Sequence, residues 1–216
     1  MTPERFQKIK KILDKRQPDL TVIMENVHKP HNIAAILRSC DAVGIGKVYG
    51  ISNSEQRVGV NLKSASGANH WVNLEVKSTM NKCIHQLKAK GFSIYCANRS
   101  KNSVDYRKID YTKSTAIVLG AELDGVSENM INNTDGEIKI PMQGMVESLN
   151  VSVANAIILF EAQRQRNKAG NYNSRRLDDS IYQRLLFQFS YPEVASILNK
   201  NQVSYPDLDD EGQIIR

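Results

Sequence analysis

Short apolar segments with the length of strands alternate along this chain with longer amphipathic segments, and this alternation constrains the fold more than any other feature. The strand-like segments are 21–25, 47–51, 71–76, 92–97, 115–120 and 137–141. Strands that alternate with helices favour an α/β core built on a mainly parallel sheet, with helices on both faces. The chain has 216 residues, which is enough for one domain with a real core.

Helical patterns account for most of the remaining chain. Thr2-Pro3-Glu4 offers a cap residue, a proline in the first turn and an acid, which is typical of a helix start. Further helices are expected up to Gly44, from Ser78 to Gly91, after Ser127, from Ser148 onward, and near 179–189 and 192–199. We expect 52–70 to be irregular and the acidic last ten residues to be frayed.

The order of these segments predicts three parts. Residues 1–17 form an N-terminal basic helical extension, 18–168 form the core, and 169–216 form a C-terminal helical extension.

No apolar run reaches the length of a membrane span, and the N-terminus lacks the apolar segment of a secretory signal. The three cysteines are odd in number and widely spaced, so neither a disulfide framework nor a zinc site is expected. A cytoplasmic location follows as the expectation.

Lysines and arginines are concentrated in two segments. Residues 1–16 carry six basic and two acidic side chains, and residues 161–176 carry five and one. The net charge of the whole chain is +6, so the middle is nearly neutral. Either segment alone would be an ordinary solvated helix face. Two of them at the ends of one core favour a polyanionic partner, with nucleic acid the first choice.

A cluster of small polar side chains opens the most apolar helical segment, 144–166. An N-cap explains Ser148, but Asn150 and Asn155 would be buried amides that need partners. The preceding "IKIPMQGM" contains a strand, a proline and a glycine. Backbone amides and small polar side chains therefore converge at a helix N-terminus.

Two further segments place polar residues near strand ends. In "IVLGAELDGVSENMI", Glu122 lies between Gly120 and Gly125 directly after a strand, where glycines let the backbone approach a ligand closely. In "HKPHNIAAILRSCDAVG", Asn32 is placed to cap a helix and Arg38 lies off its apolar stripe. A cap and a solvated arginine would by themselves explain that segment.

Two kinds of site are disfavoured. His28 and His31 suggest a metal ligand pair, but Pro30 separates them and no third ligand is evident, so no metal is expected. The G-x-G-x-x-G fingerprint of dinucleotide-binding proteins is absent, which counts against a dinucleotide-dependent oxidoreductase.

The three segments, in this order, resemble the three motifs of the SPOUT superfamily of RNA methyltransferases, in its TrmH branch. "RQPDLTV", "ENVHKPHN", "IPMQGMVESLNVSVANAIILFEAQRQR" and a late "YP" extend the resemblance over nearly the whole chain, and it thins from about residue 170. It implies an α/β core with a deep trefoil knot in its C-terminal half. It also implies a homodimer that uses S-adenosylmethionine.

The resemblance also implies roles for particular residues. The cofactor is expected to lie against Ala97, Asn98, Leu119, Gly120, Ala121, Ile140, Met142, Ser148 and Leu149. The implied catalytic residues are Asn32, Arg38, Glu122, Ser148 and Asn150. The implied RNA-binding residues are Arg5, Lys8, Lys11, Arg16, Arg164, Arg166, Lys168, Arg175 and Arg176. Arg38 matches the base proposed for the family, although a permanently protonated guanidinium would equally clamp a phosphate and stabilise a developing alkoxide.

The implied reaction is methyl transfer to the ribose 2′-hydroxyl of the D-loop guanosine of tRNA (Gm18). One alternative is a SPOUT 2′-O-methyltransferase acting on ribosomal RNA or on another tRNA position. Only about twenty residues precede the first core strand, too few for the separate substrate domain that ribosomal RNA enzymes commonly carry. A second alternative is a non-catalytic RNA-binding protein, which the presence of all five catalytic-motif residues disfavours.

Overall fold

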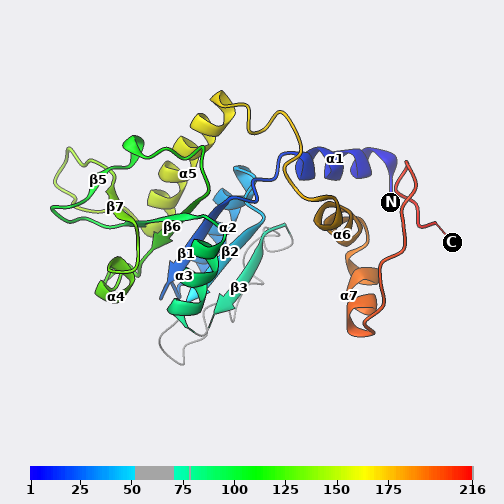
Figure 1. Ribbon diagram of the computed structural model, residues 1–216, viewed down its shortest axis with the longest axis horizontal. Coiled ribbons are helices and arrows are strands. Elements are labelled where there is room, and N and C mark those ends of the chain that lie inside the picture. Colours follow the sequence, from blue (N-terminus) through cyan, green and yellow to red (C-terminus); the bar gives the residue numbers. More distant parts are fainter. Residues whose placement is uncertain (52–70, 78, 216) are drawn as a thin grey trace. The chain divides into compact units, whose positions relative to one another are not determined.

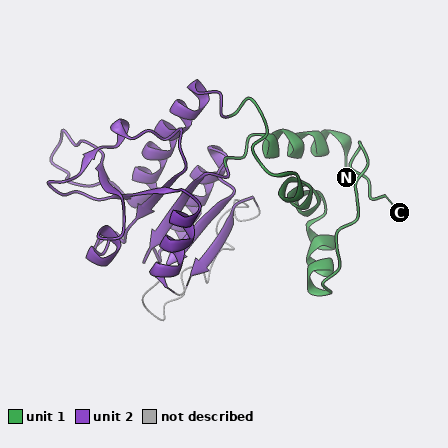
Figure 2. Cartoon of the chain, in the orientation of Figure 1, with its two compact units in different colours: residues 1–17, 172–216 green, residues 18–171 purple. Residues whose placement is uncertain are grey.

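The computed structural model describes residues 1–51, 71–77 and 79–215. The expected irregular stretch 52–70 and the expected helix cap at Ser78 lie outside the described residues. The described chain divides into two compact units, one of residues 18–171 and the other of residues 1–17 together with 172–216 (Figure 2). The two terminal extensions therefore share a single unit.

The larger unit is built on a seven-stranded sheet in the order β3-β2-β1-β6-β4-β7-β5 (Figure 1). All neighbouring strands of this sheet pair in parallel, and the sequence predicted a mainly parallel sheet. The strands are β1 (Leu20–Glu25), β2 (Lys47–Ile51), β3 (Asn73–Lys77), β4 (Ser93–Ala97), β5 (Val104–Asp105), β6 (Thr115–Leu119) and β7 (Gly136–Lys139). The two-residue strand β5 was not predicted, because so short a segment carries no periodicity.

Helices cover both faces of this sheet. On one face α2 (Pro30–Ala42) and α5 (Val151–Lys168) pack with alternate residues of β1, among them Val22 and Met24. On the other face α3 (Met80–Ala89) and α4 (Glu128–Ile131) pack with Ile23. Both central strands, β1 and β6, are buried along their whole length, which explains why they read as continuous apolar runs.

The strand order changes direction at the centre of the sheet. The chain lays β2 and β3 outward from one side of β1, and β6 then returns between β1 and β4. Ligands of α/β proteins bind beyond the carboxyl ends of the strands at such a switch point. The strand order does not by itself establish the trefoil knot, which stays a prediction.

The smaller unit is helical. It contains α1 (Pro3–Asp14), α6 (Asp179–Ser190) and α7 (Pro192–Lys200), and Thr2 caps α1 as predicted. Phe6, Ile9 and Leu13 of α1 pack against α6 in a separate apolar cluster. The expectation of a frayed C-terminus is wrong, because Leu208 and Ile214 form an antiparallel bridge and the Gln213 side chain donates to the Met1 carbonyl at 3.3 Å.

The long helix α5 begins later than predicted. Its N-cap is Asn150 and not Ser148, because the Asn150 side chain accepts a hydrogen bond from the Ser152 amide at 2.8 Å. Asn155 is fully buried beside the thiol of Cys40 on α2. Neither polar atom of its amide makes a hydrogen bond of ordinary geometry to any described residue.

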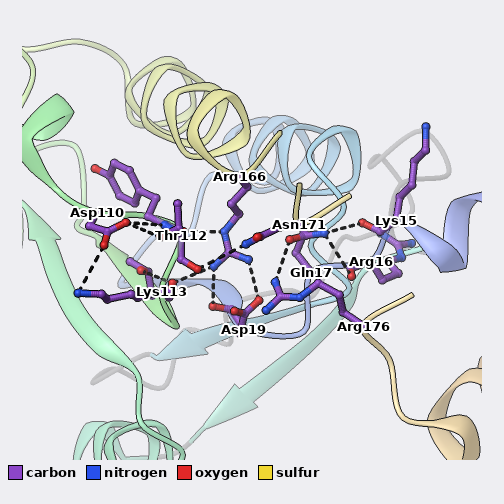
Figure 3. Close-up of polar contacts among 12 residues, drawn as sticks. Lys15, Arg16, Gln17, Asp19, Asp110, Thr112, Lys113, Arg166, Asn171 and Arg176 are labelled. Carbon is purple, nitrogen blue, oxygen red and sulfur yellow. Dashed lines mark hydrogen bonds and ion pairs between the residues drawn. The ribbon is translucent and has the colours of Figure 1, made fainter. Parts of the chain in front are cut away.

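The last turn of α5 is fastened to the sheet by Arg166, whose exposed fraction is 0%. Its guanidinium donates to the Asp19 carboxylate at 2.6 Å and to the carbonyls of Tyr111 and Lys113 at 2.7 and 2.9 Å (Figure 3). These partners lie just before β1 and just before β6. The arginine thus joins the end of α5 to the beginnings of both central strands.

Candidate active site

A cleft of about 1140 Å³ opens at the carboxyl ends of three adjacent strands, β6, β4 and β7. Its walls are the last residues of these strands, the segments that follow them, the segment that leads into α5 and the N-terminal half of α5. All nine residues expected to hold the cofactor line this one cleft: Ala97, Asn98, Leu119, Gly120, Ala121, Ile140, Met142, Ser148 and Leu149. Residues far apart in sequence meet here because parallel strands end at the same edge of the sheet.

The loop after β6 is shaped by two glycines. The backbones of Ala121 and Gly125 exchange two hydrogen bonds of 3.0 Å, which closes the loop at its base. A Cβ on Gly120 would lie 2.1 Å from the carbonyl carbon of Gly125, and Gly125 has a positive φ of 66°. These positions therefore need glycine, one for close approach and the other for its backbone conformation.

A polar cluster lies where this loop meets the start of α5. The Glu122 carboxylate accepts from the side-chain amides of Asn32 at 2.8 Å and Asn150 at 3.2 Å. The Asn150 amide also lies 3.1 Å from the Asn32 oxygen. Three of the five predicted catalytic residues thus form one hydrogen-bonded cluster, and each comes from a different motif. Asn32 is buried in the first turn of α2 and does not cap it, because the helix begins at Pro30.

Lys29 completes this cluster and was not predicted. Its ammonium forms an ion pair with Glu122. The bond from Lys29, with that from Asn32, holds the pKa of the Glu122 carboxyl below its usual value. Glu122 is therefore ionised at neutral pH and acts as a hydrogen-bond acceptor. Lys29 lies three residues before Asn32, close to one helical turn, and that spacing was the available signal.

The other two predicted catalytic residues are placed differently. Ser148 lines the cleft with Asn150 and Glu122. Arg38 is exposed on α2, six residues beyond Asn32, and does not line the cleft of its own chain. Six residues advance a helix by about 9 Å. Within the described residues, the Arg38 guanidinium makes no hydrogen bond or ion pair.

The mouth of the cleft carries an ion pair that sequence analysis also missed. The Arg99 guanidinium lies 2.8 Å from the Glu147 carboxylate and donates to the Glu147 carbonyl at 3.3 Å. Both residues line the cleft, one after β4 and the other before α5. Nothing in the sequence pairs two charges that are 48 residues apart.

The predicted RNA-binding cations divide into exposed and buried ones. Arg5, Lys8, Lys11, Arg164, Lys168 and Arg175 are exposed, and Arg176 is half-buried and donates to Gln17 at 3.2 Å. Arg16 and Arg166 are buried, with exposed fractions of 2% and 0%. Their prediction as RNA ligands is corrected, because a guanidinium enclosed by protein does not reach a phosphate.

Two further findings concern metals and membranes. Across 1–51, 71–77 and 79–215, no group of three or more His, Cys, Asp or Glu side chains is arranged to hold a metal ion. No helix in the described part of the chain combines the length and the apolar character needed to cross a bilayer.

The close approach at Gly120 leads to a prediction. We expect Gly120→Ala to weaken cofactor binding at least about tenfold and to lower thermal stability, because the new methyl group would push the Gly125 backbone away. Gly144→Ala is the matched control, since Gly144 lines the same cleft and an added Cβ there meets nothing within 4 Å. Calorimetric titration with S-adenosylmethionine measures cofactor binding by the two variants, and a thermal melt measures their stability. Equal binding by the two variants would contradict the role of the close approach.

A ligand cleft beyond a switch point of a parallel sheet, with a charged and hydrogen-bonded cluster beside it, defines the class of α/β enzymes that bind a nucleotide-like cofactor. Comparison with known proteins makes this more specific. The SpoU rRNA Methylase family matches residues 19–160, and the SpoU rRNA methylase C-terminal family matches residues 164–216. The chain belongs to the SpoU methylase family.

Individual relatives match over most of the chain. The tRNA (guanosine(18)-2′-O)-methyltransferase of Escherichia coli K12 is 43% identical over 99% of this chain and 94% of its own length. The enzyme of the same name from Thermus thermophilus is 50% identical over 86% of this chain and 95% of its own. The crystal structure of the Aquifex aeolicus TrmH/SpoU tRNA modifying enzyme is 40% identical, covers 88% of this chain and 97% of its own, and superposes with a TM-score of 0.82.

Proposed function

We propose that this protein transfers a methyl group from S-adenosylmethionine to the ribose 2′-hydroxyl of the D-loop guanosine at position 18 of tRNA. The observation that carries the proposal is the Asn32–Glu122–Asn150 cluster beside the cleft, which assembles all three family motifs at one point. The relatives that match over nearly their whole length are named for this reaction. A cytoplasmic location is part of the proposal, since tRNA is the substrate.

The cleft fits S-adenosylmethionine in its chemistry. Its apolar wall, formed by Leu119, Ile140 and Leu149, suits a flat base, and the backbone of the strand ends offers polar groups. Gly120, which lines the cleft, has no side chain, so the loop backbone closes tightly against Gly125 beside the cofactor. When bound, S-adenosylmethionine supplies a methyl group activated by its sulfonium.

The protein residues supply orientation and charge. Asn150 caps α5 while its amide group bonds to Glu122, so the helix start and the loop after β6 are fixed relative to each other. Such fixed geometry is what an in-line transfer between two aligned atoms requires. The protonated Arg38 guanidinium is suited to hold a phosphate of the substrate and to stabilise negative charge that develops on the 2′-oxygen.

The proposal is tested with labelled S-adenosylmethionine and a tRNA transcript. We expect a ribonuclease-resistant linkage at guanosine 18, because a 2′-O-methyl group removes the nucleophile on which cleavage of RNA depends. Transfer to ribosomal RNA but not to tRNA would keep the chemistry and change the substrate. Binding of tRNA without transfer to either RNA would support the non-catalytic alternative.

We propose that the exposed basic residues bind the tRNA backbone. Four of them, Arg5, Lys8, Lys11 and Lys168, make no ion pair within the described residues. If these four neutralise phosphates, affinity for tRNA falls about 50- to 150-fold between 50 and 200 mM salt through counterion release.

Removing two of these charges tests the effect, and removing a charge elsewhere provides the control. In a filter-binding titration, Lys8→Gln with Lys11→Gln is expected to reduce the salt slope by about two. Lys82→Gln, which removes an exposed cation on α3, should leave the slope unchanged. A wild-type affinity that does not respond to salt would contradict a backbone-binding surface.

We propose that two copies of the chain form the active enzyme. Val153 and Phe160 on α5 are apolar and 46% and 49% exposed, so this helix presents an apolar stripe to its surroundings. In addition, Arg38 does not reach the cleft of its own chain. A dimer that brings Arg38 of one subunit to the cleft of the other accounts for both observations.

Mixing two inactive variants distinguishes a shared site from a site within one chain. Arg38→Ala and Asn150→Ala subunits are each expected to be inactive alone. If the site is shared, a mixed dimer has one intact site, and random exchange restores about a quarter of wild-type activity. If each site lies within one chain, every site carries one defect and mixing restores nothing.

A further inference from the structure

A buried carboxylate that the proposed chemistry does not use lies at the carboxyl end of β1. Glu25 is 1% exposed and sits on the face of the sheet that carries Ile23, next to the apolar cluster of α3 and α4. A buried carboxylate needs hydrogen-bond partners to offset the loss of water. Among the described residues, both of its partners come from Ser127: the Ser127 amide donates to Oε2 at 2.8 Å, and the Ser127 hydroxyl donates to Oε1 at 2.7 Å.

Ser127 terminates the loop that carries Glu122. Its hydroxyl also accepts from the Met130 amide at 3.1 Å and so caps α4. Between the end of β6 and Ser127 lie the two glycines and the closed base formed by Ala121 and Gly125. Any movement of Ser127 is therefore passed through the short loop base to Gly120, which lines the cleft.

Both ends of this loop are attached to consecutive residues of one strand. Leu119, at its start, is the sheet partner of Met24, and Ser127, at its end, is bonded to Glu25. Its Glu122 is held by Lys29 and Asn32, which follow β1 directly. The segment from Met24 to Asn32 thus holds the loop at its beginning, its middle and its end.

We propose that Glu25 is a positioning residue for methyl transfer: it fixes Ser127 and thereby sets the loop that presents Glu122 and the Gly120–Ala121 wall of the cleft. The inference rests on the proposed function. Glu25 acts from the face of α3 and α4, through Ser127. Without this attachment the end of the loop keeps the packing of Val126 and the hydrogen bonds of Ser127 to α4, but it loses the link of Ser127 to Glu25 on β1. Displacements of about 1 Å at a site of aligned transfer cost up to about a hundredfold in rate.

The test compares two variants that remove buried groups from the same face. Glu25→Ala removes the attachment, and Ile84→Ala removes a buried side chain of α3 in the same cluster. Both are expected to lower the melting temperature. Affinity for S-adenosylmethionine, measured by calorimetry without RNA, is expected to fall about tenfold in Glu25→Ala and to remain within about twofold of wild type in Ile84→Ala. The kcat for a tRNA transcript is likewise expected to fall in Glu25→Ala and to stay near the wild-type value in Ile84→Ala.

Glu25→Gln supplies the rescue. Its amide oxygen accepts from the Ser127 amide and its NH2 group donates to the Ser127 hydroxyl, so the attachment persists. We expect this variant to keep cofactor affinity and kcat within about threefold of wild type. The inference is overturned if Glu25→Ala binds and turns over as wild type does, or if Ile84→Ala loses as much per folded molecule. If wild type transfers no methyl group to tRNA, the proposed function fails. The affinities of Glu25→Ala, Ile84→Ala and Glu25→Gln for S-adenosylmethionine, relative to wild type, still decide the role of Glu25.

Discussion

Arg38→Ala is expected to lower methyl transfer to tRNA by at least about a thousandfold while changing affinity for S-adenosylmethionine by less than about twofold. The two effects separate because the guanidinium lies outside the cleft of its own chain. Binding of the cofactor needs the strand ends, which the substitution leaves untouched. Turnover needs the cation, since the positive charge within the cluster around Glu122 is that of Lys29, which is already paired with Glu122.

Arg38→Lys distinguishes a requirement for positive charge from a requirement for the planar guanidinium group. A lysine keeps the charge and loses the bidentate geometry. Retention of a few per cent of activity would indicate electrostatic stabilisation, and full loss would indicate that two parallel hydrogen bonds to a phosphate matter. Lys82→Ala on α3 is the control for a lost surface charge. An Arg38→Ala enzyme that retains more than about a tenth of wild-type turnover would contradict a direct role.

Arg166→Met is expected to lower the free energy of unfolding of the larger unit by about 3 kcal/mol. The substitution leaves the Asp19 carboxylate without its cation and removes the donor to the carbonyls of Tyr111 and Lys113. Asp19 is 18% exposed, so water partly compensates and the value lies at the lower end of the range for broken buried pairs. Urea unfolding measures the change, and Trp71, the one tryptophan of the chain, belongs to the larger unit and reports on it.

Two comparisons make this prediction specific. Arg164→Met, two residues earlier on α5, removes an exposed partner of Glu161 and is expected to cost less than about 1 kcal/mol. Asp19→Asn added to Arg166→Met removes the carboxylate charge that has lost its Arg166 partner and should recover part of the loss. If Arg166→Met unfolds at the same urea concentration as Arg164→Met, the buried network does not stabilise the unit.

The sequence predicted the sheet well because buried parallel strands are continuous apolar runs with clear ends. The burial of β1 and β6 on both faces produced the signal, and turn residues marked where they stop. Strand β5 has two residues and produced no such signal. The start of α5 was misplaced because Ser148 and Asn150 are both good caps, and tertiary contacts of Asn150 with Asn32 and Glu122 decide between them.

The sequence predicted those site residues that are positioned by the ends of strands. It missed those that are positioned by side-chain pairs between distant residues. Nine cofactor positions gather in one cleft because each ends or follows a parallel strand or leads into α5. The pairs Arg99–Glu147 and Glu25–Ser127 join distant residues that no local pattern connects. For Lys29–Glu122 the spacing of Lys29 from Asn32 was the available signal.

The basic segments and the family resemblance together misassigned Arg16 and Arg166 as RNA ligands. Both arginines lie in segments rich in lysine and arginine, which are usually solvent-exposed, yet both side chains are buried. Arg166 is in fact the last-turn side chain that fastens α5 to the sheet. Sequence counts of lysine and arginine identify a basic segment but do not separate cations that face solvent from those that hold buried carbonyls.

The central claim is that this chain methylates the ribose 2′-oxygen of guanosine 18 in tRNA. The most direct measurement compares two otherwise identical tRNAs, one with guanosine at position 18 and the other with 2′-deoxyguanosine there, using labelled S-adenosylmethionine. We predict full transfer to the first and none to the second, because the deoxynucleotide lacks the accepting oxygen. Equal labelling of both tRNAs would place the methyl group on another atom or another nucleotide and would contradict the account.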